Sequence, residues 1–478
     1  MKRFISCFSL IVVFSLSGSG IISAAIKLPS IFSSNMVIQQ NADVPIWGTG
    51  TPGEKISVKC SWNEKAYETE TDYENNWKVV IKTPDAKAGS QTITIRGSRT
   101  IILENVMPGE VWLCAGQSNM AWRAKDGILN DKVEIENASY PNVRFFNVRL
   151  NASDTPQNDL NAVWTSCTPE TMQNFSAIGY FFGRELNQNL EVPIGLINVG
   201  WGGTNIEQWI SATEIEKDED AVKSAGINNT KAAGDKYGRI YNGMIAPLIP
   251  FKIMGVIWYQ GESNVAWPFN YGKLLRGMID SWRASWDDEF FFYQVQIAPF
   301  YYSRQYESAL VREQQFAMRG YHKTGMVVTT DIGKLDDIHP QNKQEVGKRL
   351  ASWALSKAYS KYGFPFSGPV YNSMIIDRNT IRIQFDYANK GLQIKGEGRS
   401  PILKEIQIAG ADRKFYDATA KIDSRDGTVL IVSSPNVKKP IAVRYGFSNT
   451  PQGNLFNGEN LPASPFRTDK WEIIPKID

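Results

Sequence analysis

Histidine and cysteine are scarce in this chain of 478 residues, which has only two histidines and four cysteines. The cysteines lie at positions 7, 60, 114 and 167, and no CxxC or HxxxH spacing occurs. Such spacings are typical of structural zinc sites, so the sequence predicts no metal site. The wide spacing also implies no disulfide framework. We expect Cys60, Cys114 and Cys167 to be small buried side chains, with a disulfide between two of them as the alternative.

Basic tracts and long apolar runs are missing as well. The 52 Lys and Arg residues nearly balance the 49 Asp and Glu residues, and without a basic stripe we expect no nucleic-acid partner. One longer apolar run, residues 4–16, follows Lys2 and Arg3 and precedes Ser23-Ala24-Ala25. This order predicts a signal peptide over residues 1–25, and hence a secreted or periplasmic protein without a membrane span after cleavage. An uncleaved anchor helix is the alternative, although the run is short for a bilayer.

Hydrophobic residues make up 42% of the chain, enough for a large core divided among several domains. From residue 26 to 105, apolar and polar residues alternate in short runs between turn signals, which predicts an N-terminal β-sandwich domain. These runs are residues 44–48, 56–60, 77–81 and 91–95. Short strands return after residue 363, and we expect a C-terminal β domain over residues 364–478. Its expected strands are residues 380–385, 405–409 and 428–432.

The middle of the chain, residues 106–363, has a different pattern. Unbroken apolar runs typical of buried parallel strands alternate with helical segments, which predicts an α/β domain with a parallel sheet. The strand runs are residues 111–115, 193–199, 253–259, 290–297 and 325–330, and the helical segments are residues 181–190, 271–286 and 343–362. Functional residues of such sheets gather at the carboxyl ends of the strands, so the loops directly after these runs are the candidates for a site.

A serine follows the first of these strands, in Gly116-Gln117-Ser118-Asn119. Gly116 permits a tight turn, and Ser118 then lies where a strand gives way to a helix. Backbone N–H groups at a helix start can bind an oxyanion, so Ser118 is a candidate nucleophile. An ordinary helix-capping serine is the alternative.

A histidine follows the strand at residues 325–330, in Asp336-Asp337-Ile338-His339. A serine nucleophile needs a nearby base, and histidine is the usual base at neutral pH. Either Asp336 or Asp337 could orient the His339 ring and stabilise its cation. His322 has no acidic residue within three positions, and we expect it to be a surface or structural histidine.

Two further loops offer hydrogen-bond donors. Gly202 and Gly203 follow the strand at residues 193–199 and expose backbone N–H groups, which suits an oxyanion hole or a plain turn. Gln260 and Asn264 follow the strand at residues 253–259 and offer side-chain amides. Ser263 in the same string is a rival nucleophile, but the adjacent carboxylate of Glu262 would oppose a developing oxyanion. Together the four loops fit the requirements of acyl transfer.

Three strings resemble the sialate O-acetylesterase family of the SGNH hydrolase superfamily. They are Gly109–Met120 (GEVWLCAGQSNM), Trp258–Asn264 (WYQGESN) and Asp337–Pro340 (DIHP), and shorter matches occur at residues 35–40, 241–248 and 462–469. The resemblance therefore covers almost the whole chain after residue 25. It implies an SGNH-type three-layer α/β/α core with a parallel sheet, flanked by β domains, and no cofactor or metal.

The resemblance also implies roles for individual residues. Ser118 would be the nucleophile and His339 the base, and Gly202 or Gly203 together with Gln260 would form the oxyanion hole. The third triad member stays open between Asp336 and Asp337, and a Ser-His dyad is a further alternative.

The expected substrate is an O-acetylated sialic acid or another acetylated glycan. We expect substrate contacts from Asn119, Glu262 and Trp122. Candidate partners of a sialic acid carboxylate are Arg123, Arg239 and Arg312. An esterase for xylan or pectin side chains, or a non-catalytic carbohydrate-binding protein with a hydrolase fold, are the alternatives.

Overall fold

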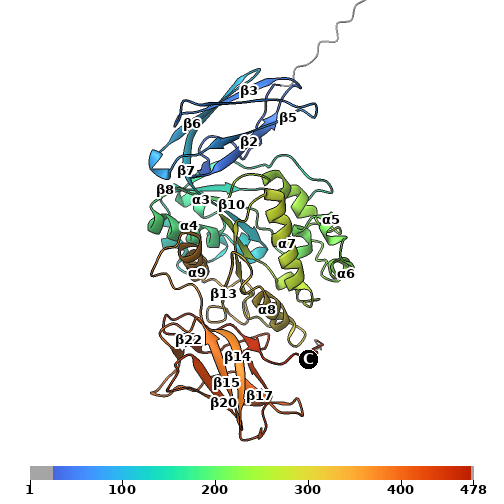
Figure 1. The fold of residues 1–478 in the computed structure, drawn as a ribbon, viewed down its shortest axis with the longest axis vertical. Helices are drawn as coiled ribbons and strands as arrows, with labels where there is room; N and C mark the ends of the chain where they lie inside the picture. Colours follow the sequence, from blue (N-terminus) through green and yellow to red (C-terminus); the bar gives the residue numbers. More distant parts are fainter. Residues whose placement is uncertain (1–24, 475–478) are drawn as a thin grey trace, which may run out of the picture.

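The computed structural model describes residues 25–474 and has three parts along its long axis (Figure 1). An N-terminal β part lies at one end, a central α/β part in the middle and a C-terminal β part at the other end. The expected signal peptide falls on residues 1–25 and so lies almost wholly outside the described residues. None of the helices in residues 25–474 is long and apolar enough to cross a bilayer.

The N-terminal part is built from strands whose side chains alternate between core and solvent. In β5, for example, Trp77, Val79 and Ile81 are buried while their neighbours are exposed, as expected for a half-buried strand. β2 pairs with β5, and β3 pairs with β4 and β6. The strands are β1 (Val37–Gln39), β2 (Asp43–Thr49), β3 (Lys55–Cys60), β4 (Ala66–Glu70), β5 (Asn76–Lys82) and β6 (Gln91–Arg96).

One long strand, β7 (Thr100–Gly116), joins the N-terminal and central parts. Its first half pairs with β6, and its second half pairs in parallel with β10 and β11 of the central sheet. The expected boundary between residues 105 and 106 therefore falls inside a strand that both parts share. Every residue of β7 from Pro108 to Gly116 is buried, because helices cover this half of the strand on both faces.

The central sheet has the strand order β13-β12-β11-β7-β10-β8-β9. All neighbouring pairs are parallel except β8 and β9. The added strands are β8 (Tyr140–Asn147), β9 (Trp164–Cys167), β10 (Ile194–Asn198), β11 (Gly255–Tyr259), β12 (Phe291–Val295) and β13 (Thr324–Val327). The five predicted strands are confirmed, whereas β8 and β9, which lack a long apolar run, were not predicted.

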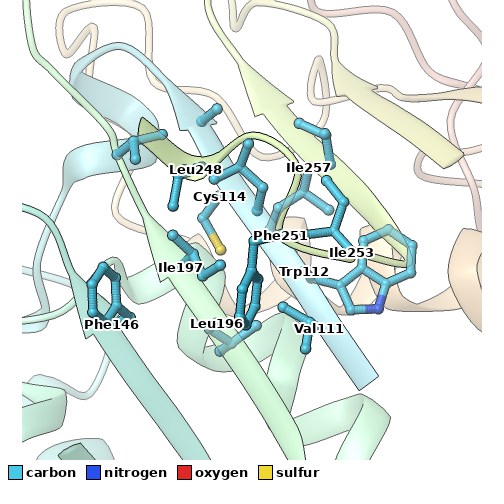
Figure 2. Close-up of a cluster of buried hydrophobic side chains, with 14 of the residues drawn as sticks. Val111, Trp112, Cys114, Phe146, Leu196, Ile197, Leu248, Phe251, Ile253 and Ile257 are labelled. Atoms are coloured by element: carbon cyan, nitrogen blue, oxygen red, sulfur yellow. The ribbon is translucent and has the colours of Figure 1, made fainter. Parts of the chain in front are cut away.

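Helices cover both faces of this sheet, which makes the α/β/α core of three layers. On one face Trp112 packs against Phe182 of α4, and on the other face Trp258 packs against Trp282 of α7. Figure 2 shows Trp112 and Cys114 of β7 beside Leu196 and Ile197 of β10 in this core. The helices are α1 (Ser118–Ala121), α2 (Asp131–Glu136), α3 (Pro169–Met172), α4 (Ala177–Leu190), α5 (Ala212–Ile215), α6 (Glu219–Ile227), α7 (Tyr271–Trp286), α8 (Glu307–Ala317) and α9 (Lys343–Trp353).

The C-terminal part consists of short antiparallel strands around a separate core, as predicted. One sheet has the order β14-β15-β20-β19 and another the order β18-β17-β21-β23, while β16 pairs with β22. The strands are β14 (Val370–Asp377), β15 (Thr380–Asp386), β16 (Leu392–Ile394), β17 (Ile406–Ala409), β18 (Phe415–Asp417), β19 (Thr419–Ile422), β20 (Val429–Ser433), β21 (Ala442–Tyr445), β22 (Leu455–Asn457) and β23 (Phe466–Arg467).

The three described cysteines, Cys60, Cys114 and Cys167, are free and buried, which confirms the expectation of small buried side chains. Burial raises the pKa of the Cys60 and Cys167 thiols to about 12, so both stay protonated at neutral pH.

Candidate active site

Ser118 follows β7 directly, in a turn that only glycine permits. Gly116 has a φ of 134°, and a Cβ on it would lie 2.2 Å from the backbone oxygen of Tyr259. The chain then starts helix α1 at Ser118, so the N–H of Ser118 has no acceptor within the helix. We call residues 116–119 the serine loop.

The structure brings Ser118 and His339 together across 221 residues of sequence. The Nε2 atom of His339 lies 2.8 Å from the Oγ atom of Ser118. The ring of Trp122 stacks on the His339 ring, with centroids 4.4 Å apart and planes 22° apart. Burial and the nearby Lys343 lower the pKa of His339, against the opposing effect of Asp337, so the ring is neutral at neutral pH. A neutral imidazole at this distance can accept the serine proton.

The two candidate carboxylates of the histidine loop, residues 336–340, differ in position. The Asp336 side chain is 71% exposed and lies 3.7 Å from the ammonium of Lys334. The Oδ1 atom of Asp337 accepts the backbone N–H of His339 at 2.8 Å. Within residues 25–474 neither carboxylate accepts a hydrogen bond from the His339 ring. Asp337 is therefore the nearer group, and it acts on the backbone of the histidine loop.

Gln117 connects the serine loop to the glutamine loop, which we define as residues 260–264. Its Oε1 atom accepts from Gln260 Nε2 at 3.1 Å and from the backbone N–H groups of Gly261 and Ser263 at 3.2 Å each. The Gln117 side chain is buried, with 3% of its surface exposed. A buried carbonyl shared by three donors fixes one loop relative to the other.

Gln260 is fully buried, and its amide N–H groups serve the protein itself. They donate to Gln117 Oε1, to the backbone oxygen of Thr204 at 3.1 Å and to Asn264 Oδ1 at 2.8 Å. Asn264 in turn donates to Glu207 at 2.9 Å and accepts from the N–H of Ile206. This differs from the expectation of an oxyanion donor at Gln260, because no N–H of its amide is left for a ligand.

Asn119, the residue after Ser118, joins three segments. Its Nδ2 atom donates to Glu262 Oε1 at 2.7 Å and to the backbone oxygen of Ile338 at 3.0 Å, and its Oδ1 atom accepts from Lys343 Nζ at 2.5 Å. Asn119 is fully buried, and Glu262 and Lys343 are 6% and 1% exposed. Asn119 and Glu262 thus hold the loops in place, which differs from the expected substrate contacts.

Lys343 was not among the predicted site residues. Its position four residues after His339 was the signal available in the sequence, but lysines are usually solvated. Trp122, the third expected substrate contact, is half-buried on the His339 ring and donates from Nε1 to the Gly127 oxygen at 2.8 Å.

The glycine loop, residues 200–205, approaches Ser118 from β10. A Cβ on Gly202 would lie 3.3 Å from the Cβ of Ser118, and the N–H of Trp201 donates to the Gly116 oxygen at 2.9 Å. Gly203 has a φ of 72°, where glycine is favoured. In the described part of the chain, the N–H groups of Gly202 and Gly203 have no hydrogen-bond acceptor. They are available to a ligand beside Ser118.

Ser263 and His322, the alternative serine and histidine, do not form a pair like that of Ser118 and His339 in the described residues. Neither histidine contacts Ser263 within residues 25–474, and His322 is 66% exposed near Glu289, as expected for a surface histidine.

The three arginines proposed for a substrate carboxylate already have partners. Arg123 pairs with Asp126 at 2.7 Å, and Arg239 pairs with Asp154 at 2.9 Å. Arg312 is buried among backbone oxygens, including those of Ile297 and Ala298. Among the described residues, no group of three or more His, Cys, Asp and Glu side chains could hold a metal ion.

Comparisons with known proteins identify the relatives of this chain. A family model described as "Carbohydrate esterase, sialic acid-specific acetylesterase" matches residues 108–356, which include all four loops. The chain is 29% identical over 487 residues to the sialate O-acetylesterase of Homo sapiens, covering 92% of each protein. It is 27% identical over 525 residues to that of Mus musculus, covering 92% of this chain and 94% of the mouse protein. The solved structure of a carbohydrate acetylesterase from Xanthomonas citri is 35% identical, with a TM-score of 0.84 over 94% of this chain and 100% of that chain.

Proposed function

Because the chain belongs to the family of sialic acid-specific carbohydrate acetylesterases, we propose that it removes acetyl groups from O-acetylated sialic acids through an acetyl-enzyme on Ser118. The contact of 2.8 Å between Ser118 Oγ and His339 Nε2, at the carboxyl end of a parallel sheet, carries this proposal. It supplies a nucleophile with its base, which a purely carbohydrate-binding protein has no need to retain.

The proposed reaction has two halves. His339 Nε2 takes the proton of Ser118 as Oγ attacks the acetyl carbonyl carbon and the carbonyl π electrons move to oxygen. The tetrahedral intermediate collapses, the bond to the sugar oxygen breaks, and that oxygen takes the proton from His339. A water molecule, deprotonated by His339, then attacks the acetyl-Ser118 carbonyl. The second intermediate releases acetic acid, which loses its proton to solvent as acetate, and Ser118 Oγ regains a proton from His339.

Backbone N–H groups are the proposed oxyanion donors. Ser118 at the start of α1 offers one, and Gly202, which packs against Ser118, offers another with no acceptor in the described structure. Gly203 is a further candidate on the same loop. Donors fixed in this way before the reaction stabilise the developing charge without reorganisation.

Replacement of the nucleophile tests the proposal. Ser118→Ala is expected to lower kcat for a small acetyl ester by about three orders of magnitude or more, because the acetyl-enzyme cannot form. Ser263→Ala is the matched control, since Ser263 lies in a similar G-x-S-N string of the glutamine loop, and it should retain activity. An inactive Ser263→Ala beside an active Ser118→Ala would show that the wrong serine is assigned.

A second substrate class, neutral acetylated glycans such as xylan or pectin side chains, has one observation in its favour. Arg123, Arg239 and Arg312 each already have a partner within the protein, with which a sialic acid carboxylate would have to compete. Acetate release from acetylated sialic acid and from acetylated xylan, each with Ser118→Ala as control, separates the two classes. A preference for xylan would overturn the sialate assignment and leave the serine mechanism intact.

The proposed site of action is outside the cytoplasm. This rests on the basic start, apolar run and small-residue stretch within residues 1–25. N-terminal sequencing of the exported protein should begin near residue 26, and an intact N-terminus in the cytoplasm would contradict it.

A further inference from the structure

Lys343 has an unusual environment for a lysine. It is the first residue of α9, and it is 1% exposed. The N-terminus of a helix carries a partial positive charge, so a cation there is unfavourable. Removing an ammonium group from water is unfavourable as well, and burial lowers the pKa of Lys343 to about 7. Both costs require a compensating interaction nearby.

Asn119 connects Lys343 to the compensating negative charge, which is the carboxylate of Glu262. The Lys343 ammonium donates to Asn119 Oδ1, and Asn119 Nδ2 donates to the carboxylate of Glu262. Since the ammonium form of Lys343 can only donate, its contact fixes the orientation of the Asn119 amide. The second N–H of that amide then reaches the backbone oxygen of Ile338, the residue before His339. Asn119, the residue beside Ser118, therefore links the serine loop to α9, the glutamine loop and the histidine loop.

Lys343 also lies beside the base. Its Nζ atom is 5.6 Å from the centre of the Trp122 ring, and Trp122 stacks on His339. The charged groups around His339 are Asp337 on its own loop, Lys343 on α9 and Glu262 behind Asn119 on the glutamine loop. Lys343 opposes a second positive charge on the imidazole, and Asp337 favours one.

We propose that Lys343 is a positioning residue for the reaction at Ser118: it fixes Asn119 across three segments and holds a positive charge beside the stacked rings of Trp122 and His339. The inference rests on the proposed function for its catalytic meaning. Its geometry is independent of the substrate class, because no group of the ligand takes part in the contacts.

The test combines Lys343→Met, which removes the charge and the donor, with Lys348→Met as the matched control. Lys348 is exposed on the same helix, so its replacement leaves the site intact. For Lys343→Met we expect the acid limb of the pH profile of kcat/KM to move up by about one pH unit, since the positive charge that opposes protonation of the imidazole is gone. On the alkaline plateau, kcat should fall about tenfold with little change in KM, because the histidine loop loses its alignment.

Two histidines in the whole chain allow a readout that does not depend on activity. In an untagged protein, His322→Gln leaves His339 as the one imidazole that proton NMR follows. When Lys343→Met is added to this background, the His339 titration should move to higher pH. An unchanged His339 titration would overturn the proposal.

A second variant covers the case in which Lys343→Met does not fold. Lys343→Met/Glu262→Gln removes both buried charges and keeps an acceptor for Asn119, and its His339 titration should also move to higher pH, because the repulsion by Lys343 is absent. No upward movement in this variant overturns the proposal. Loss of the proposed function is distinguishable, because it would appear as wild-type protein without esterase activity, whatever the titration of His339.

Discussion

Replacement of Asp337 by asparagine decides how His339 is supported. In a serine triad whose aspartate accepts from the imidazole, this change costs about four orders of magnitude in kcat, because the wrong tautomer forms. Here the Oδ1 atom of Asp337 accepts the backbone N–H of His339 at 2.8 Å. Asparagine keeps an oxygen acceptor at this position and loses only the charge. We therefore expect a loss of about tenfold in kcat, or about 1.4 kcal/mol.

The negative charge of Asp337 sets the direction in which the pH profile moves. The Asp337 charge raises the pKa of His339, so Asp337→Asn should move the acid limb of kcat/KM to lower pH. Asp336→Asn is the matched control; its side chain is 71% exposed beside Lys334, and activity should stay within about twofold. Steady-state kinetics on a small acetyl ester across pH measures both effects. A loss of about a thousandfold or more in Asp337→Asn would refute this reasoning, because it would mean that the carboxylate holds the ring itself.

Two further predictions concern the unmodified base and the loop contacts. Burial and Lys343 lower the pKa of His339 below the ordinary histidine value of about 6.5. The kcat/KM of the wild-type enzyme should therefore fall on acidification only below about pH 6.5. A fall in kcat/KM that begins above this pH would contradict the prediction. Gln117→Met leaves the N–H groups of Gly261 and Ser263 without their acceptor. Each lost hydrogen bond costs about 1 kcal/mol or more, so urea unfolding should show a free energy of unfolding lower by about 2–3 kcal/mol. The exposed Gln393→Met is its control, and equal stability of the two variants would count against the loop contact.

Much of the fold was predictable because the central strands are buried on both faces. Such strands read as unbroken apolar runs, as in β11, and their order along the chain places the loops after them at one edge of the sheet. The pairing of Ser118 with His339 could be predicted from this rule and from the scarcity of histidine. β8 was missed, since Arg144 interrupts its apolar residues and finds its partners in backbone oxygens of Asn35 and Asn105.

The roles of the polar residues beside the nucleophile could not be predicted from the sequence. Asn119 and Glu262 resemble residues that bind a ligand, yet their partners are each other, Lys343 and a backbone oxygen of the histidine loop. These contacts join residues that are 143 and more positions apart in the chain, and no local pattern encodes them. Gln260 likewise donates to two distant acceptors, Gln117 and Thr204, which lie on the serine and glycine loops.

The most direct test of the central claim is to trap the acetyl-enzyme. The protein is mixed with an acetyl ester, quenched in acid before deacylation is complete, digested and mapped by mass spectrometry. We expect a single added acetyl group on Ser118, absent from Ser118→Ala and from protein without ester. An acetyl group on Ser263, or an active enzyme in which no acetyl group ever appears on Ser118, would contradict the proposed mechanism.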